Sequence, residues 1–308
     1  MLFISVIPII IYLIVLKLID SFSIARWRML AMCMAYGAAI CAFMYFILIH
    51  IVSWESAWVS PAIEELLKCA LMLWLIKSRR IQFVSEGVIY GAAVGGGFSI
   101  VENTLYTLCN PDYMTLGTAL FRGLGVSVMH MGCTALSACI IQLVSQWSIT
   151  LFVPILIHYL HNTITIVPSL KLGSVLLIFL ALFATLFYIS DRKIYRWIDF
   201  GINEYIGTLA AIRTGNFSST RAGQYLLAVK EQFQPEIFFD MICYVQIHYE
   251  LTINRQSRML MQQAGFGSEL THEQQKDIED KQAELKALRR NIGATAWWVI
   301  QPLVRIKE

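Results

Sequence analysis

The run PAIEELLKCALMLWLI, residues 61–76, combines charged side chains with an apolar stretch suited to the inside of a lipid bilayer. Glu64, Glu65 and Lys68 are costly at that depth, because no bulk water solvates them there. Soluble helices also begin with Ser-Pro followed by acids, which suit the positive end of the helix dipole, and Ser60-Pro61 fits this alternative. The local pattern alone therefore leaves both interpretations open.

Polar residues elsewhere in the chain favour a site within the membrane. Three other apolar segments contain acids, histidines or amides, namely Glu102 with Asn103, His130, and His158 with Asn162. Ionisable residues inside membrane segments are rare and usually functional. Four such segments predict a shared functional site.

The composition is that of a membrane protein followed by a water-soluble part. Apolar residues make up 57% of the 308 residues and charged residues only 15%, which is well outside the soluble norm. Residues 1–190 hold 9 Lys/Arg and 7 Asp/Glu, whereas residues 191–308 hold 15 and 14. The sequence predicts an all-α fold: a polytopic membrane helix bundle over 1–190 and a helical cytoplasmic domain over 191–308.

Seven segments are long enough to cross a bilayer, for which about 20 apolar residues are needed. They are 2–19, 30–52, 57–76, 82–108, 115–143, 149–167 and 172–190. The first lacks the basic region and cleavage site of a signal peptide, so we expect it to be retained.

The basic clusters predict the orientation. Arg26 and Arg28, the cluster 77–80 and the cluster 191–196 all fall on one side if the N-terminus faces out, while Glu55 and Asp112 fall on the other. The tail is then cytoplasmic, and the membrane is expected to be a bacterial inner membrane. Glu64 lies 13 residues before Lys77, about 20 Å along a helix, and so belongs in the outer half.

Helical spacing groups the polar residues into faces. Glu64 and Lys68 are four residues apart in the favourable order for an ion pair. Phe98, Glu102 and Tyr106 share one face, and His158 and Asn162 share another. Arg122, in the fifth segment, is expected to pair with an acid.

Glycines mark one face of the fourth segment. Gly87, Gly91 and Gly95 recur at four-residue spacing, which allows another helix backbone to approach closely. We expect packing rather than phosphate binding, because no Lys-Ser/Thr follows. If the third segment is the partner, Glu64 comes near Glu102.

These groups favour water-mediated hydrolysis. Carboxylates that share a low-dielectric site cannot all stay ionised, and one that holds a proton intermittently can move it between water and a leaving amine. Histidine and asparagine can stabilise a developing oxyanion. Nucleophilic catalysis fits less well, since Ser127 near His130 lies in no Gly-x-Ser-x-Gly elbow.

Zinc is the alternative, because Glu and His are also its ligands. The helix motif His-Glu-x-x-His is absent from the sequence, and no other tight ligand spacing replaces it. The seven cysteines form no CxxC pair and read as small core residues. The sequence therefore disfavours a metal and predicts no cofactor.

The order of these motifs resembles a known family. Glu-Glu-x-x-Lys at 64–68, Phe-x-x-x-Glu-Asn-x-x-Tyr at 98–106, His130 and His-x-x-x-Asn at 158–162 look like the PrsW-type glutamic intramembrane proteases. These belong to the superfamily of CAAX-prenyl endopeptidases and bacteriocin-processing membrane proteases. The resemblance covers roughly residues 55–165.

The resemblance implies an endopeptidase that cleaves membrane-anchored proteins. Glu64 is then the general base that activates water, with Glu65 and Lys68 shaping its surroundings. His158 and Asn162 form the oxyanion hole. Glu102 takes the place of a histidine of the CAAX branch, and His130 is a further candidate at the reacting atoms; Phe98, Asn103 and Tyr106 are supporting residues of the same motif.

The tail, residues 191–308, lies outside the resemblance. It is expected to form helices over 221–231, 236–263 and 272–290, the last with a thin apolar stripe of Ile278, Leu285 and Leu288. Alternating acids and bases argue against nucleic acid. We expect this part to bind a cytoplasmic protein or to self-associate.

Two other classes of function remain open. A transporter or ion pathway uses intramembrane acids equally well, although the sequence shows no internal repeat and no matching pair of broken helices. A catalytically silent membrane scaffold is the other alternative.

Overall fold

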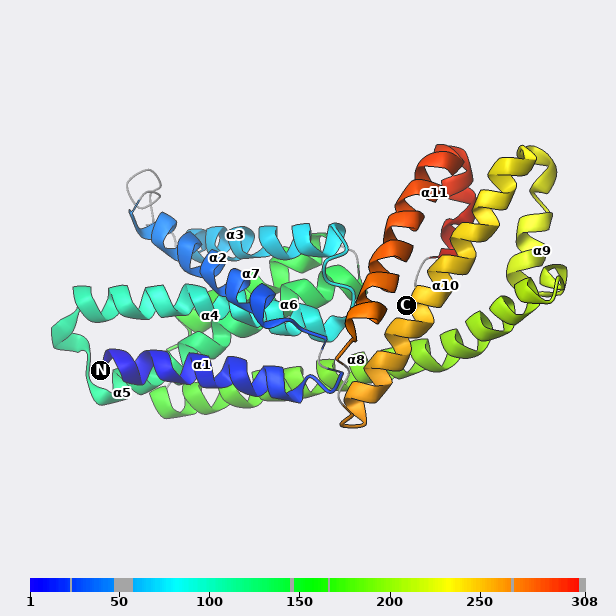
Figure 1. Cartoon of the computed structure of the whole chain (residues 1–308). Helices are drawn as coiled ribbons and strands as arrows, with labels where there is room; N and C mark the ends of the chain where they lie inside the picture. Colours follow the sequence, from blue (N-terminus) through cyan, green and yellow to red (C-terminus); the bar gives the residue numbers. More distant parts are fainter. Residues whose placement is uncertain (23, 47–57, 145–146, 166, 267–268, 305–308) are drawn as a thin grey trace. The chain divides into compact units, whose positions relative to one another are not determined.

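The computed structural model describes residues 1–22, 24–46, 58–144, 147–165, 167–266 and 269–304, and it contains helices but no strand among them (Figure 1). The end of the predicted second segment, residues 47–52, the first residue of the third, and Glu55 lie outside these residues. The chain divides into two compact units, Met1–Asp191 and Arg192–Glu308.

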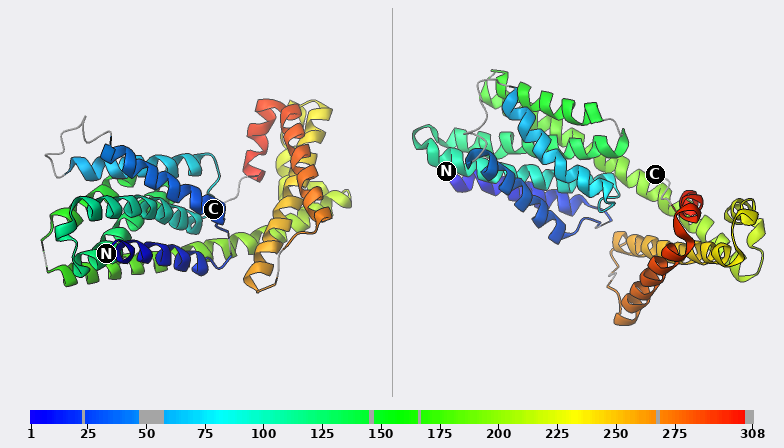
Figure 2. Two further views of the ribbon diagram at one scale, coloured as in Figure 1. Left: turned by 60° about the vertical axis from the view of Figure 1, so that its left-hand side comes forward. Right: turned by 90° about the horizontal axis from the view of Figure 1, so that it is seen from above.

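The first unit is a helix bundle (Figures 1 and 2). Its helices are α1 (Leu2–Ile19), α2 (Trp27–Phe46), α3 (Val59–Lys77), α4 (Val84–Cys109), α5 (Leu116–Leu120), α6 (Ser127–Leu143), α7 (Trp147–Thr163) and the first part of α8 (Pro168–Arg213). A short 3-10 turn, Pro111–Tyr113, follows α4, and a π-helical turn, Phe121–Val126, joins α5 to α6.

Five of the described helical segments are long and apolar enough to cross a membrane: 2–19, 27–46, 84–109, 116–143 and 168–213. This finding makes the protein an integral membrane protein of helical class by composition and length. Helices α3 and α7 are not among these five. Helix α3 carries charged residues, including buried Glu65 and Lys68, and α7 has only 17 residues. The predicted seventh segment ends at residue 190, whereas α8 continues to Arg213.

Helix α4 is the centre of the bundle, and its glycines explain why. A Cβ at Gly91 would lie 2.7 Å from the Cα of Ala135, and a Cβ at Gly95 would overlap the carbonyl of His130. The glycine face therefore packs backbone to backbone on α6. The partner of this face is α6 and not α3, the case considered from the sequence, because the small side chains of α6, such as Ala135, allow a close approach.

The other faces of α4 are also in tight contact. The backbone of Gly97 meets Met34 of α2, and Gly37 of α2 meets Val94 of α4. With α1 packed alongside, α4 is buried over most of its length. A helix enclosed in this way holds its polar residues, including Glu102, in fixed positions.

The second unit has its own core. It contains α9 (Arg221–Leu227), α10 (Pro235–Gln263) and α11 (His272–Val304), with short turns at Phe217–Ser219 and Lys230–Gln232. Helices α10 and α11 pack on each other, and α11 is kinked at Gly293, whose φ of 73° suits glycine. Buried Leu288, Ile292 and Ile300 of α11 join Met241 and Val245 of α10 in the core.

The apolar stripe predicted on α11 is partly used inside this unit. Leu288 is buried, and Leu285 packs against the same core. His248 of α10 is partly buried, and desolvation lowers its pKa to about 4, so the imidazole is neutral at neutral pH.

Candidate active site

Helix α3 supplies two acids and a lysine from one helical face. Lys68 Nζ donates a hydrogen bond to Glu65 Oε1 at 2.7 Å and lies 4.0 Å from Glu64 Oε2, as expected for residues three and four apart on a helix. Lys68 is fully buried and Glu65 is 1% exposed. Each charge therefore depends on the other for compensation.

His130 of α6 connects the lysine to an acid of α4. Its Nδ1 lies 3.0 Å from Lys68 Nζ, and its Nε2 lies 3.0 Å from Glu102 Oε2. An ammonium can only donate hydrogen bonds, so Nδ1 is the acceptor. The imidazole proton then sits on Nε2 and faces the Glu102 carboxylate.

His158 of α7 faces the α3 acids from the other side. Its Nδ1 lies 2.9 Å from Glu65 Oε1, and its ring stands edge-on to His130 with centroids 4.7 Å apart. Because an ionised carboxylate can only accept, Nδ1 carries a proton. The second ring nitrogen, Nε2, lies 3.9 Å from Glu64 Oε2.

Glu64 has one oxygen that makes a hydrogen bond and one that does not. Among the described residues the buried Oε2 of Glu65 also lacks a hydrogen-bond partner, but Glu64, unlike Glu65, lines a pocket. Ser60 Oγ donates to Glu64 Oε1 at 2.6 Å. Glu64 Oε2 lies 4.0 Å from Lys68 Nζ, 4.0 Å from His130 Nδ1 and 3.9 Å from His158 Nε2, each beyond direct hydrogen-bond range. One oxygen is thus fixed, and the other faces three nitrogens at a common distance.

Glu102 is held from its other side by an arginine. Arg122 Nη2 lies 2.9 Å from Glu102 Oε1, and Arg122 Nε donates to Asn103 Oδ1 at 3.0 Å. The guanidinium lies over the ring of Tyr106, 4.1 Å from its centroid, a favourable cation–π position. The expected pairing of Arg122 with an acid is confirmed, and Tyr106 supports the arginine rather than the acid.

Asn103 connects neighbouring helices through hydrogen bonds. It is fully buried, and its Nδ2 donates to the Ser5 carbonyl of α1 at 3.0 Å and to Ser127 Oγ at 3.2 Å. Ser127 in turn donates to the Arg122 carbonyl at 2.9 Å. The π-helical turn that presents Arg122 is therefore fixed at both ends.

Phe98 covers the buried lysine. Lys68 Nζ lies 4.4 Å from the centroid of its ring, and the His130 ring lies 5.1 Å away. Placing an aromatic face over a desolvated ammonium adds an attraction of about 2 kcal/mol. Phe98 therefore helps to keep Lys68 charged inside the bundle.

Asn162 is the predicted site residue that the structure does not bring into this group. It lies near the end of α7, one helical turn beyond His158, and its side chain is exposed. His161, between them in sequence, is buried and stacks on Phe121.

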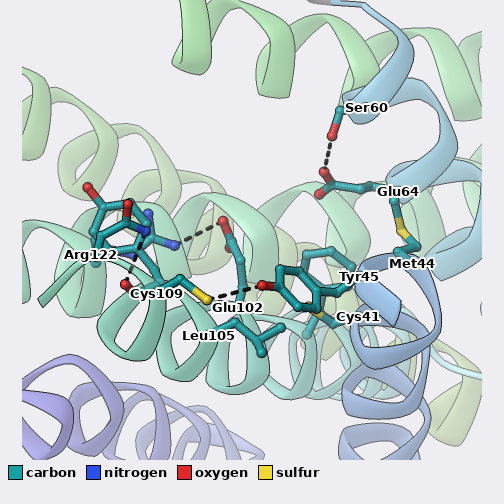
Figure 3. A pocket seen from close by; sticks show the side chains of 12 residues that line it. Cys41, Met44, Tyr45, Ser60, Glu64, Glu102, Leu105, Cys109 and Arg122 are labelled. Carbon is teal, nitrogen blue, oxygen red and sulfur yellow. Dashed lines mark hydrogen bonds and ion pairs between the residues drawn. The ribbon is translucent and has the colours of Figure 1, made fainter. Parts of the chain in front are cut away.

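A pocket of about 280 Å³ opens beside the acids (Figure 3). Ser60 and Glu64 lie at one side of it, and Glu102 and Arg122 lie at another. Helix α2 lines a further part of the pocket with Cys41, Met44 and Tyr45. The sequence did not single these residues out, because α2 carries no charged or histidine side chain at this depth. Ser60 was also missed as a site residue, although its four-residue spacing to Glu64 was a usable signal.

A carboxylate and two imidazoles in this group have the chemistry of a metal site. One ligand atom each of Glu64, His130 and His158 lies within 4.8 Å of the others, and such a donor set is known for catalytic zinc. However, the Nδ1 of His130 already accepts a hydrogen bond from Lys68. With a buried ammonium at this position, the described residues leave fewer than three ligands and do not fit a zinc ion.

Comparisons with known proteins identify the membrane part. Residues 25–189 match the family described as PrsW family intramembrane metalloprotease, which is more than half of the chain. No curated protein and no solved structure matched. The matched region contains α3, α4, α6 and α7, which supply Glu64, Glu102, His130 and His158. The chain is therefore a member of the PrsW family of intramembrane proteases.

Proposed function

We propose that this protein hydrolyses a peptide bond of a membrane-anchored protein, with Glu64 as the general base and without a metal. The observation that supports it is the environment of Glu64: one oxygen is fixed by Ser60, and the other faces Lys68, His130 and His158 at 3.9–4.0 Å from the wall of a pocket. This oxygen is free to receive a proton from a water molecule. A kinship with the CAAX-prenyl endopeptidases is part of the proposal and rests on the order of the motifs.

The reaction proceeds by addition of water and loss of the amine. Glu64 Oε2 takes one proton of the water while the water oxygen bonds to the carbonyl carbon. The carbonyl oxygen becomes an oxyanion. The carbon–nitrogen bond then breaks, the nitrogen takes the proton from Glu64, and the products are a carboxylic acid and an amine.

The charges of the cluster indicate that it holds one further proton. Three carboxylates, of Glu64, Glu65 and Glu102, face two cations, Lys68 and Arg122. One more proton makes the group neutral. We place it on Nε2 of His158, the ring nitrogen that faces Glu64.

A protonated His158 donates to the oxyanion, a contribution of about 3–4 kcal/mol where single donors have been removed. Asn162 lies one turn along the same helix and is exposed, so a bound substrate can reach its amide. We propose it as the second donor. Glu65 and Lys68 hold His158 and His130 in place, and Glu102 holds His130 from the opposite side.

A strong chelator is expected to leave the cleavage rate unchanged, because Lys68 supplies the positive charge that a metal would otherwise bring. The measurement is cleavage of a labelled single-span peptide by the purified protein, with and without chelator. A zinc-dependent hydrolase in the same detergent is the control for chelation. If the chelator abolished activity and zinc restored it, a metal would be activating the water, which would contradict the proposal.

The membrane arrangement we propose has seven spans, with α3 and α7 crossing as well, the N-terminus outside and the second unit in the cytoplasm of a bacterium. The basic residues after α3 and within α8 support it. A reporter fused after Arg196 should then read cytoplasmic, and one inserted at residues 109–114 should read external. The reverse pattern would overturn the orientation and the depth assigned to Glu64.

The second unit, by the same proposal, binds a cytoplasmic protein or a second copy of this chain. Its helices are charged on their exposed faces with both signs mixed, which disfavours nucleic acid. The mass of the purified full chain in detergent distinguishes self-association from binding of another protein. A monomeric mass would exclude self-association and leave a different cytoplasmic protein as the partner.

A further inference from the structure

The pocket beside Glu64 has two chemically different parts. Its polar side is formed by Ser60, Glu64, Glu102 and Arg122. The remainder is mostly apolar, with these contributions from α2 and α4: Cys41, Met44 and Tyr45, then Phe98, Leu105, Tyr106, Cys109 and Asn110. A pocket with one reactive side and one apolar side is suited to recognition as well as chemistry.

The charges at the pocket are already compensated. Arg122 and Glu102 are paired at 2.9 Å, and Glu64 Oε2 lies 4.0 Å from Lys68 Nζ. A lysine or arginine side chain in the apolar part would lose its hydration and find no carboxylate among the residues that line that part, which is costly. The occupant is therefore uncharged.

The size of the pocket further restricts which occupant fits. Its volume is about 280 Å³, just below the range of about 300–1,000 Å³ that encloses a whole small-molecule ligand. A single large side chain with its Cα fits this space, and a glycine or alanine would leave most of the apolar wall uncovered. Burying a Leu, Met or Phe side chain is favourable by about 1.5–3 kcal/mol.

We propose that this pocket binds one large apolar side chain of the protein substrate, at a residue that flanks the bond to be cleaved. The inference rests on the proposed function, because a side chain seated here carries its own peptide group to the side where Glu64 lies. Cys41, Met44 and Leu105 would then set the size of side chain that is accepted.

The rim of the pocket contains a residue that can report occupancy. Cys109 is exposed, and its Sγ lies 3.0 Å from the hydroxyl of Tyr45 across the pocket (Figure 3). A side chain bound against Tyr45 would shield this thiol from alkylation. Cys243, in the second unit, is partly exposed and provides an internal reference.

The experiment uses the full chain with Glu64→Gln, so that binding is observed without turnover. N-ethylmaleimide labelling of Cys109 and Cys243 is followed by mass spectrometry in the presence of N-acetyl amides of leucine, phenylalanine, glycine and lysine. A probe at four times its dissociation constant slows labelling about fivefold. We expect this at Cys109 with the leucine and phenylalanine amides, no slowing with the glycine and lysine amides, and no change at Cys243.

Two substitutions on α4 form a matched pair. Leu105→Trp places a ring in the pocket and should abolish protection of Cys109. Leu108→Trp adds the same ring at a position that is 69% exposed and outside the pocket lining, and should leave protection intact. Both variants carry one added indole, so a general effect on folding would appear in both.

Several outcomes would overturn the inference. Equal slowing by the glycine amide, or protection that survives Leu105→Trp, would show that the pocket does not select the side chain. Protection by decanoate alone would assign the pocket to a lipid chain. Because no turnover is needed, such a failure is separate from a failure of the catalytic proposal, which the wild-type cleavage assay tests.

Discussion

Replacing Glu64 with Gln is expected to lower the rate of peptide-bond cleavage by about 10²–10⁴-fold, the usual contribution of a general base. The amide keeps the shape of the side chain and can still accept a hydrogen bond from Ser60 Oγ at the position of Oε1. It cannot take a proton from water. The rate should be measured with a labelled single-span peptide, alongside thermal unfolding of the variant in the same detergent.

Glu65→Gln is the matched control for this prediction, one position along the same helix. Glu65 is engaged by Lys68 and His158, so its substitution disturbs positions but removes no base, and its effect on the rate should be smaller. Full activity of Glu64→Gln with an intact fold would refute the assignment of Glu64.

Replacing Lys68 with Ala is expected to destabilise the membrane unit by about 3–5 kcal/mol, the cost of leaving one partner of a buried ion pair uncompensated. Glu65, which is 1% exposed, would keep its charge with only His158 beside it. His130 would lose the donor to its Nδ1. The free energy of unfolding should be measured by denaturant titration in mild detergent.

Lys77→Ala, at the exposed end of the same helix, should change stability by about 1 kcal/mol or less, because interactions of exposed charges are weak. The double substitution Lys68→Met with Glu65→Leu should recover part of the loss, because it removes both charges. If the free energy of unfolding of Lys68→Ala equalled that of Lys77→Ala, the buried ion pair would not be what stabilises α3 in the bundle.

The sequence predicted which residues form the site better than it predicted which helices pack together. The helical spacing of Glu64, Glu65 and Lys68 is local, and local spacing determines which side chains share a face. The recurrence of acids and histidines in separate apolar segments was enough to expect that Glu102, His130 and His158 meet. The match of residues 25–189 confirmed the PrsW family and the intramembrane protease class.

Contacts between helices distant in sequence could not be obtained in this way. The glycine face of α4 was evident, but whether it packs on α3 or α6 depends on the shape of both candidate partners. The apolar wall that α2 contributes to the pocket, including Cys41 and Met44, has no polar signal that separates it from lipid-facing residues. The placement of Asn162 depends on where α7 ends, and helix ends are set by tertiary packing as much as by spacing.

The π-helical turn at Phe121–Val126 has a consequence for insertions and deletions. Its hydrogen bond from the Ser127 amide to the Arg122 carbonyl spans five residues instead of four, so the turn holds one residue more than an α-helix would. Deleting one residue could be absorbed as a regular helix with every backbone hydrogen bond retained. The segment before it would nevertheless rotate by about 100° about the helix axis, and Arg122 would leave Glu102. In this stretch the number of residues, as much as their identity, encodes which way the arginine points.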